Sequence, residues 1–373
     1  MLGSAFGSGT ISISSTKSVA GDLPNRLDYS SVDQVYKSLR DNYDGKLTAQ
    51  QLEDGLKHGL ANATKDPYTS YFTPKEAEDF NKELNNSFSG IGAQLGQDKD
   101  GNLEVIAPID GLPADKAGIK PGDLIATING ENTSGMSVDD AVSKIRGPSG
   151  TKVTLQVVRD KAQALSFTIT RQNITLPSVK TKILEGNIGY IQITSYADDT
   201  DDLMDKAANE MAAKNVKGII LDLRNNPGGL LESAIHVSSL WLPQGATILQ
   251  EKRGTTVTDT QRATGGDKLN GTPTVVLINA GSASASEITA GALHDNHAAY
   301  VIGEKSYGKG VVQQLINFRD GSQLKVTVAS WYRPNGQNIN KKGITPDQTV
   351  KLNDDATPEN DNQLQAAQAH LMR

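Results

Sequence analysis

The sequence predicts a multidomain protein of mixed helix and sheet, with α+β and α/β parts, because its pattern changes character twice. Residues 29–85 repeat apolar positions at helical spacing, and residues 86–172 alternate apolar and polar positions between glycine-rich turns. Residues 173–352 alternate short apolar runs with helical sequence, which is typical of buried parallel strands. A chain of 373 residues normally forms two or three domains and can bury a core without disulfides or metals.

The composition argues against several classes of protein. The absence of cysteine removes thiol nucleophiles, cysteine–zinc sites and disulfides. The net charge is -6 and no dense Lys/Arg stripe occurs, which argues against a nucleic-acid binder. The 5 histidines show no zinc-binding spacing, so neither a metal nor another cofactor is expected.

The two ends of the chain are polar. Residues 1–28 are rich in Ser, Gly and Thr and read as a flexible linker, whereas residues 353–373 read as a tail with a weak helix at Leu364–Leu371. No apolar run of about 20 residues occurs. The lack of cysteine fits an extracytoplasmic protein of the periplasm, cell wall or outer membrane face, although many cytosolic proteins also lack it. We expect such a location, with an export signal or membrane anchor missing from this sequence.

Residues 29–85 predict three helices. Val32, Val35, Leu39 and Tyr43 recur at three-to-four spacing, which predicts a helix with one buried face. Thr48 suits the N-cap of a second helix, and Pro74 suits the first position of a third. The partial amphipathicity of the terminal helices also suits a homodimer.

Residues 86–172 predict a small β-rich domain. A glycine-rich turn at Ser89–Ala93 begins a strand, and residues 112–130 give a short helix, the turn Gly-Ile-Lys-Pro-Gly-Asp and a strand ending in Asn-Gly. Strands are predicted at Leu103–Ile106 and Val153–Val158, with a helix at Val138–Ile145 between them. This segment resembles a PDZ domain, a barrel-like domain that binds a peptide as an added strand and holds its C-terminal carboxylate by backbone N–H groups.

The resemblance implies the residues that bind the peptide. The carboxylate loop would consist of Gly90, Ile91, Gly92 and Ala93. The apolar side chain of the peptide would enter a pocket lined by Ile91, Leu95 and Val142. Taken alone, the glycine pair would more simply indicate a tight turn.

Three serines alternate with alanine at residues 282–286, between an apolar strand at Thr274–Ile278 and a helix through Leu293. Such a junction presents a serine at the carboxyl edge of a sheet, beside free helix N–H groups that can stabilise an oxyanion. The serines could instead only cap the helix. At ~1.5 Å per residue His294 lies roughly 15 Å along this helix, too far to act as the base. His236 lacks a triad-like context, although the sequence alone does not exclude it.

A lysine offers the other base. Lys309 follows a predicted strand at Tyr300–Gly303 and lies between Gly308 and Gly310, which allow a close approach of the backbone. A base must be neutral, and burial among apolar side chains favours the neutral form of a lysine. Gln313, four residues on, could orient the amine. The alternative is a surface lysine in a glycine turn.

Several specific motifs then occur in one order. They are the stretch Leu221–Leu230 with Asn-Asn-Pro-Gly-Gly, the serines followed by Glu287, Tyr307–Gly310 with Gln313, and Gly343–Asp347. From about Leu27 to Val350 the chain therefore resembles the carboxyl-terminal processing peptidases, or tail-specific proteases. These are Ser–Lys serine endopeptidases with an embedded PDZ domain and a crotonase- or Clp-protease-like α/β core.

The resemblance implies the catalytic roles. Ser284 would be the nucleophile, Lys309 its base and Gln313 the residue that orients the lysine. The oxyanion donors would be backbone N–H groups of Ala285 and of the Gly228-Gly229 turn. The reaction would be acyl transfer through an acyl-enzyme, on proteins with free C-termini that are cut within or near their tails.

Other positions match the family less decisively. Arg146 would couple the placement of the PDZ domain to the active site, Asp295 would be structural, and Glu287 matches without an assigned role. The segment 337–343 departs from the family pattern, which affects local substrate contacts. Two rival interpretations are weaker, because a non-catalytic PDZ adaptor would need a broken dyad and an acyl-CoA enzyme of the crotonase type would need neither a PDZ insertion nor a Ser–Lys pair.

Overall fold

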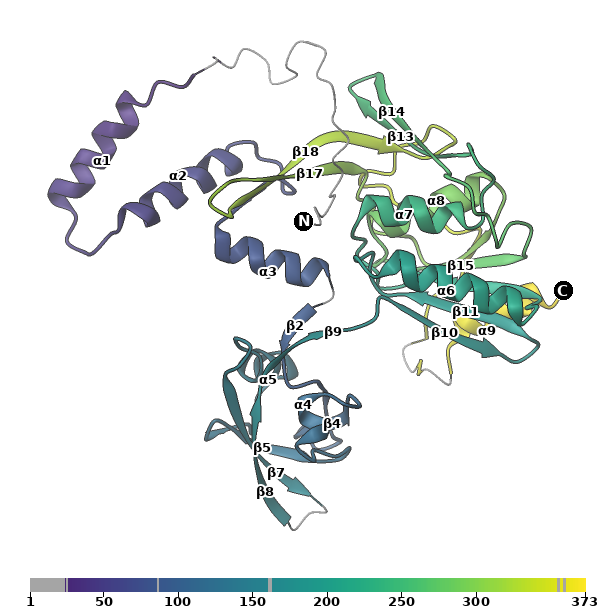
Figure 1. Ribbon diagram of the computed structural model, residues 1–373, viewed down its shortest axis with the longest axis horizontal. Coiled ribbons are helices and arrows are strands. Elements are labelled where there is room, and N and C mark those ends of the chain that lie inside the picture. The colour runs from purple at the N-terminus through teal and green to yellow at the C-terminus, as the bar shows by residue number, and fades with distance from the viewer. Residues whose placement is uncertain (1–23, 25, 86, 160–162, 354–355, 358–359) are drawn as a thin grey trace. The chain divides into compact units, whose positions relative to one another are not determined.

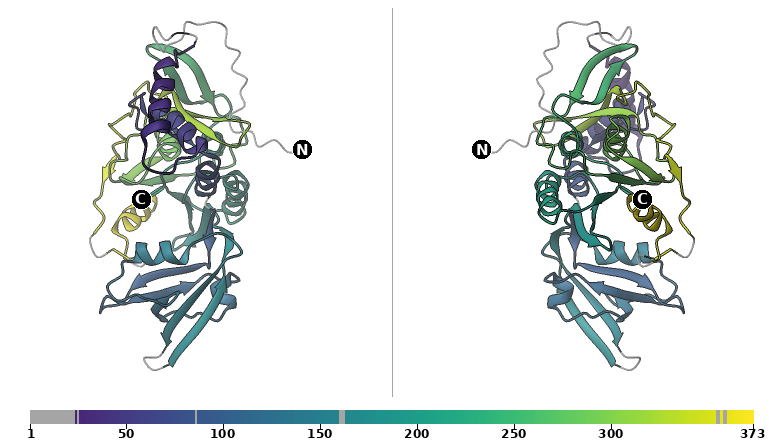
Figure 2. Two further views of the ribbon diagram at one scale, coloured as in Figure 1. Left: turned by 90° about the vertical axis from the view of Figure 1, so that its left-hand side faces the viewer. Right: turned by 90° about the vertical axis from the view of Figure 1, so that its right-hand side faces the viewer.

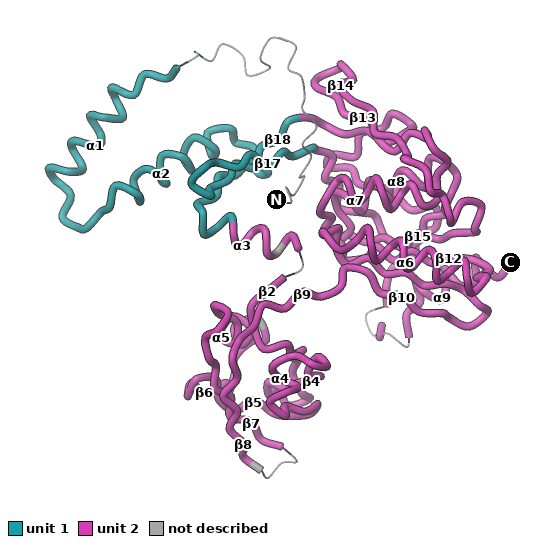
Figure 3. Tube along the Cα trace, in the orientation of Figure 1, with its two compact units in different colours: residues 1–77, 312–328 teal, residues 78–311, 329–373 magenta. Residues whose placement is uncertain are grey.

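The computed structural model describes residues 24, 26–85, 87–159, 163–353, 356–357 and 360–373 (Figure 1). The linker expected at residues 1–28 lies almost wholly outside this range. The chain divides into two compact units, coloured in Figure 3, of which unit 1 comprises residues 1–77 and 312–328 and unit 2 the remainder. The predicted mixture of helices and sheets in several domains is confirmed.

Unit 1 combines the N-terminal helices with a small antiparallel sheet. Its elements are α1 (Ser30–Asn42), α2 (Ala49–Asn62), β1 (Ser70–Phe72), the start of α3 (Pro74–Leu84), most of β17 (Val311–Asn317) and the first part of β18 (Gln323–Tyr332). The predicted N-cap is confirmed, because Thr48 accepts a hydrogen bond from the Gln51 N–H while the Gln51 side chain accepts one from the Thr48 N–H. The third helix begins at Pro74, as predicted.

The prediction of a buried face on the first helix is wrong. The helix forms at α1, but it contains no buried residue. Val35 is 60% exposed, Leu39 37% and Tyr43 54%. The periodicity fixes the helical conformation, whereas burial requires a partner surface, and nothing else in the described chain covers this stripe.

The PDZ segment of unit 2 forms its own sheet and core. The sheet consists of β3 (Ala93–Gln97), β4 (Leu103–Pro108), β5 (Leu124–Ile128), β7 (Lys152–Arg159) and β8 (Gln163–Thr170) in this order, with β6 (Glu131–Asn132) paired to β5. Two helices, α4 (Pro113–Lys116) and α5 (Val138–Ile145), accompany it, and α5 has the predicted bounds. Val105, Val153 and Val157 are fully buried between them. Before and after this domain, β2 (Ser87–Gly90) and β9 (Gln172–Thr175) pair antiparallel.

The last part of unit 2 is built on a six-stranded sheet. Its strand order is β10 (Val179–Leu184), β11 (Ile188–Ile193), β12 (Gly218–Asp222), β15 (Thr274–Ile278), β16 (Tyr300–Gly303) and β19 (Gln348–Thr349). All neighbours run parallel except β10, which is antiparallel to β11. Every residue of β12 and β15 is buried, so the two apolar runs form the predicted buried parallel strands.

Helices and a hairpin complete this part. They are α6 (Thr200–Ala213), α7 (Leu231–Ser239), α8 (Ala285–Asp295), α9 (Asn362–Leu371) and the strands β13 (Thr247–Arg253) and β14 (Thr256–Arg262). The predicted C-terminal helix is confirmed as α9, drawn in yellow in Figure 2. It packs against β12, β15 and β16 through the buried Ala367 and its neighbours, and so covers the strands that lead into the candidate site.

Candidate active site

The central strand β15 ends in the turn that carries the three serines. The Ser282 hydroxyl is buried and donates to the Leu223 carbonyl at 2.8 Å, and the Ser286 hydroxyl is buried and donates to the Asn226 carbonyl at 2.9 Å. Both bonds tie the turn to the loop that follows β12. Ser284, between them, is half-buried. The hydroxyls of the flanking serines thus hold the turn in place, which leaves Ser284 as the candidate nucleophile of the three.

The backbone at Ser284 is strained. Its φ is 53° and its ψ -115°, a left-handed conformation that a residue with a side chain rarely adopts. Helix α8 starts at the next residue, so the N–H of Ala285 points out of the first turn, and it has no acceptor within the described chain. A strained strand-to-helix turn beside a free N–H group is the geometry of a nucleophile elbow.

The Gly228-Gly229 turn lies against this elbow. A Cβ atom on Gly228 would come within 2.7 Å of the Ser284 Cβ and 2.9 Å of the Ala285 nitrogen. Gly228 has φ 102° and Gly229 φ 141°, so both positions require glycine. The Gly228 N–H donates to Asn226 Oδ1 at 2.8 Å, whereas the Gly229 N–H has no acceptor among the described residues.

Lys309 lies in a loop of unit 2 after β16. Its flanking glycines allow the predicted close approach, because a Cβ on Gly308 would lie 2.8 Å from the Gly343 nitrogen and one on Gly310 would lie 2.6 Å from the Asn340 nitrogen. The Lys309 carbonyl accepts a hydrogen bond of 3.0 Å from the Trp331 indole. The backbone of this half-buried lysine is thus fixed by contacts with the segment 331–343.

Glu287 joins the serine turn to the lysine loop. Its carboxylate is fully buried and accepts hydrogen bonds from the N–H groups of Ser284, Gly308 and Lys309 and from the Ser306 hydroxyl. Burial raises the pKa of the Glu287 carboxyl above its ordinary value, and these hydrogen bonds offset the rise only in part. The pattern Ser-x-x-Glu at residues 284–287 is the sequence signal of a capping box and could have indicated part of this arrangement.

A second polar network is centred on Arg224, in the loop that leads from β12 to the glycine turn. Arg224 forms ion pairs with Asp222 and with Asp361, which caps the N-terminus of α9. Tyr190 donates to Asp222 at 2.8 Å, and the buried Gln363 accepts from Arg224 at 3.0 Å. Because Arg224 lies four residues before Gly228, the network connects the C-terminal helix to the loop beside Ser284.

The remaining candidates lie elsewhere. Gln313 belongs to unit 1, where its side-chain amide donates to the Tyr68 carbonyl. His236 faces Asp205 at 3.4 Å, and His294 lies between Asp295 and Asp347 at 3.0 and 2.9 Å. Asp295, at the far end of α8 from Ser284, also binds Arg333.

The carboxylate loop expected in the PDZ domain leads from β2 into β3. Ile91 is buried, and Gly92 has φ 73°. The N–H groups of Ile91 and Gly92 have no acceptor in the described structure, and β3 is the edge strand of its sheet. Leu95 and Val142 are half-buried. The guanidinium of Arg146, at the end of α5, lies 4.9 Å from the centre of the Phe88 ring.

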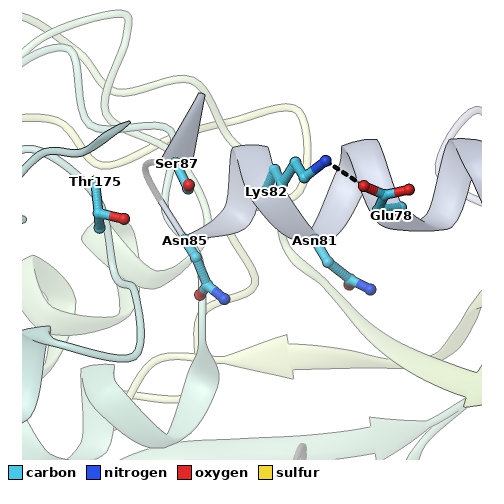
Figure 4. A pocket seen from close by; sticks show the side chains of 6 residues that line it. All are labelled: Glu78, Asn81, Lys82, Asn85, Ser87 and Thr175. Carbon is cyan, nitrogen blue, oxygen red and sulfur yellow. Dashed lines mark hydrogen bonds and ion pairs between the residues drawn. The ribbon is translucent and has the colours of Figure 1, made fainter. Parts of the chain in front are cut away.

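A further pocket lies away from these sites. An open pocket of about 390 Å³ is lined by Glu78, Asn81, Lys82, Asn85, Ser87 and Thr175 (Figure 4). None of the candidate residues lines it. The described residues hold no group of three or more His, Asp or Glu placed to bind a metal, and none of their helices is both long and apolar enough to cross a bilayer.

The sequence is similar to known proteases along most of its length. Residues 187–350 match peptidase family S41 and residues 79–158 match the PDZ domain family. Over 326 residues, 87% of this chain and 70% of the relative, the chain is 40% identical to the carboxy-terminal processing protease CtpA of Bacillus subtilis. It is 38% identical over 322 residues to a CtpA-like serine protease of Staphylococcus aureus, covering 86% of this chain and 64% of that protein.

Solved structures agree with this assignment. The photosystem II D1 C-terminal processing protease matches with a TM-score of 0.53 and 28% identity, over 86% of this chain and 87% of that one. An S41 protease of Bacteroides fragilis has the same fold, with a TM-score of 0.59 and 16% identity over 94% of this chain and 99% of that one. The chain therefore belongs to peptidase family S41, as a carboxy-terminal processing serine protease with a PDZ domain.

Proposed function

We propose that this endopeptidase cuts protein substrates within or near their C-terminal tails, with Ser284 as the nucleophile and Lys309 as the general base. The observation that carries the proposal is that both residues donate a backbone hydrogen bond to the carboxylate of Glu287. The backbone N–H groups of Ser284 and Lys309 donate to the same oxygen atom of Glu287, each at 2.9 Å. Two residues from separate loops are thereby held beside one another.

The reaction follows from this pair. Ser284 Oγ attacks the carbonyl carbon of the peptide, and its proton passes to the neutral amine of Lys309. When the tetrahedral oxyanion collapses, the C–N bond breaks and Lys309 returns the proton to the leaving amine. Water then attacks the acyl-enzyme, with Lys309 taking its proton, and the C–O bond to Ser284 breaks as the serine recovers a proton.

Backbone N–H groups would stabilise the oxyanion. The N–H of Ala285 and the Gly228-Gly229 turn lie beside Ser284, and the donors without a partner in the described chain are those of Ala285 and Gly229. Such preorganised donors contribute about 3–4 kcal/mol each to the transition state. Gln313 would orient the Lys309 amine, as its position four residues further along the chain suggests.

The PDZ domain would bind the free C-terminus of the substrate. The N–H groups of Ile91 and Gly92 in the Gly90–Ala93 loop, which have no acceptor among the described residues, suit a carboxylate. The open edge of β3 suits an added strand with its side chain toward Leu95. Arg146 would couple peptide binding to the protease core. An Arg146→Ala variant with unchanged activity and an unchanged response to C-terminal peptides would contradict that role.

The location and the assembly state complete the proposal. The absence of cysteine supports an extracytoplasmic location, and the exposed apolar stripe of α1 supports a homodimer. Cell fractionation tests the location. Light scattering of the purified protein and of a Leu39→Asp variant tests the dimer, which we expect the variant to weaken.

Cleavage of unstructured casein tests the catalytic assignment. We expect wild type to cut casein, and Ser284→Ala and Lys309→Ala to fail while keeping wild-type thermal unfolding. Full activity of Lys309→Ala would refute the lysine as base. If wild type alone is inert, peptides with a free C-terminus are added, to test whether the PDZ domain holds the enzyme inactive until a peptide binds. A wild type that stays inert with such peptides would refute the proposed function.

A further inference from the structure

We propose that Glu287 is a positioning residue that sets the geometry of the nucleophile and its base through their backbones. The proposal rests on the Ser284–Lys309 pair proposed above. Glu287 is a buried acid that the reaction itself does not use. Its carboxylate connects three elements, because it lies in the first turn of α8, contacts the elbow before that helix and contacts the loop after β16.

The two carboxylate oxygen atoms of Glu287 accept hydrogen bonds from different groups. Oε1 accepts from the Ser306 hydroxyl at 2.6 Å and from the Gly308 N–H at 2.7 Å, both in the loop that carries Lys309. Oε2 accepts from the N–H groups of Ser284 and Lys309, each at 2.9 Å. The backbone nitrogens of the two reactive residues are therefore separated by at most twice this distance. One oxygen orders the lysine loop, and the other fixes that loop to the nucleophile.

The arrangement also holds the elbow in its strained state. Ser284 has φ 53°, and a non-glycine residue in such a conformation costs about 1–3 kcal/mol unless its surroundings impose it. Its N–H is directed at a carboxylate, and hydrogen bonds to a charged acceptor are about twice as strong as neutral ones. The Ser306 hydroxyl in turn accepts from the Ile344 N–H at 2.6 Å, so the lysine loop is supported from its far side as well.

The substitution Glu287→Gln distinguishes the two oxygens. A glutamine has nearly the same shape, but only one of its two terminal atoms accepts hydrogen bonds. If its oxygen keeps the Ser306 and Gly308 bonds, its amino group faces the N–H groups of Ser284 and Lys309, and donors then oppose donors. We expect the variant to fold, with the contact between the elbow and the lysine loop specifically lost.

The experiment has one readout that does not depend on activity. Amide hydrogen exchange is measured at single-residue resolution in wild type, Glu287→Gln and the control Glu304→Gln. The control changes a carboxylate of the same loop that has no bond to Ser284 or Lys309 in the described structure. We expect exchange at Ser284 and Lys309 to become faster in Glu287→Gln, with Gly308 still protected. Unchanged exchange at Ser284 and Lys309 would overturn the proposal, whether or not the protein cuts casein.

Kinetics provide the second readout. We expect kcat of Glu287→Gln to fall on the order of 100-fold with KM nearly unchanged, because a displacement of about 1 Å has this effect on a reacting pair. A merely structural residue would lower the melting temperature without separating kcat from KM. The variant Ser306→Ala provides this comparison, since it removes a donor to Oε1 only. If Ser306→Ala loses as much kcat as Glu287→Gln, or Glu287→Gln keeps wild-type kcat, the positioning role is refuted.

Two further results are decisive as well. If Glu287→Gln does not fold, Glu287→Asp replaces it, because a side chain one methylene shorter cannot reach both loops, and the same faster exchange at Ser284 and Lys309 is expected. If wild type shows no peptidase activity, that result counts against the proposed function only. The exchange measurement alone then tests the positioning role of Glu287.

Discussion

Gly228 lies so close to Ser284 that a methyl group in its place would come within 2.7 Å of the serine Cβ. The same methyl group would lie 2.7 Å from the Ala283 carbonyl oxygen and 2.9 Å from the Ala285 nitrogen. The glycine turn after β12 and the serine turn after β15 therefore touch at backbone level. Their geometry depends on the absence of a side chain at residue 228.

The variant Gly228→Ala is expected to reduce kcat on the order of 100-fold or more, since the clash displaces the elbow or the glycine turn. Gly245→Ala is the matched control, because Gly245 also has positive φ (87°) but has nothing within 4 Å of the added carbon. It should lose only about 1–2 kcal/mol of unfolding free energy. Casein cleavage and urea unfolding measure both effects. Equal loss of activity in the two variants would contradict the contact argument.

Alanine substitutions of the three serines are expected to affect stability and activity differently. Ser282→Ala and Ser286→Ala each remove one donor from a carbonyl group that keeps a second, backbone N–H donor, so each should lose about 0.5–1.5 kcal/mol of unfolding free energy and keep measurable activity. Ser284→Ala should lose activity and keep its stability. Urea unfolding beside casein cleavage separates the two patterns. An inactive Ser286→Ala protein with wild-type stability would show that the wrong serine has been assigned.

The stability of the fold should depend on pH through His294. Burial lowers the pKa of this imidazole, but its hydrogen bonds to Asp295 and Asp347 outweigh burial and Arg333, so the net shift is upward from 6.5. Its folded-state stabilisation is then complete below about pH 6.5 and is lost as the pH rises through the raised pKa. We expect the stability advantage of wild type over His294→Gln to shrink between pH 6 and pH 9. His297→Asn, at an exposed position after the same helix, is the control, and an advantage that grows with pH would contradict the assignment.

Asp361 should stabilise the connection between α9 and the loop that follows β12. Burial opposes its ionisation, but hydrogen bonds from Arg224 and from the backbone keep its pKa below the usual 3.8. Asp361→Asn keeps the helix cap and removes the charge, and we expect it to lose about 1–3 kcal/mol of unfolding free energy at pH 7. The loss should diminish only as the pH falls below 3.8, because the stabilisation disappears as this group protonates. A loss that is constant down to pH 2 would contradict the ion pair.

Much of the fold follows from local sequence patterns. The helix at Val138–Ile145, the strand at Thr274–Ile278 and the N-cap at Thr48 agree with the sequence because periodicity and capping act over a few residues. The exposed face of α1 does not follow from its pattern. An apolar stripe specifies a helix, whereas its burial depends on surfaces remote in the sequence.

In the candidate site, too, the sequence indicates the local contacts and not those between distant segments. The glycines around Lys309 indicated a close backbone approach, and the structure contains it. The bond from Lys309 to Glu287 could not be predicted, because the two residues are 22 positions apart and meet only when β15 and β16 pair. The bond from Ser284 to Glu287 spans only 3 residues and is the local one that the Ser-x-x-Glu pattern indicates. The buried hydroxyls of Ser282 and Ser286 likewise depend on β12, some 60 residues earlier in the chain.

The attachment of α9 to Arg224 has a consequence for the order in which the enzyme matures. Arg224 and Asp361 are 137 residues apart, so this ion pair closes only after the ribosome has made the whole six-stranded sheet. During synthesis, the loop beside Ser284 therefore lacks this ion pair until α9 has been made. A nascent chain that ends before α9 would thus carry the loop after β12 without the Arg224–Asp361 ion pair that connects it to the C-terminal helix.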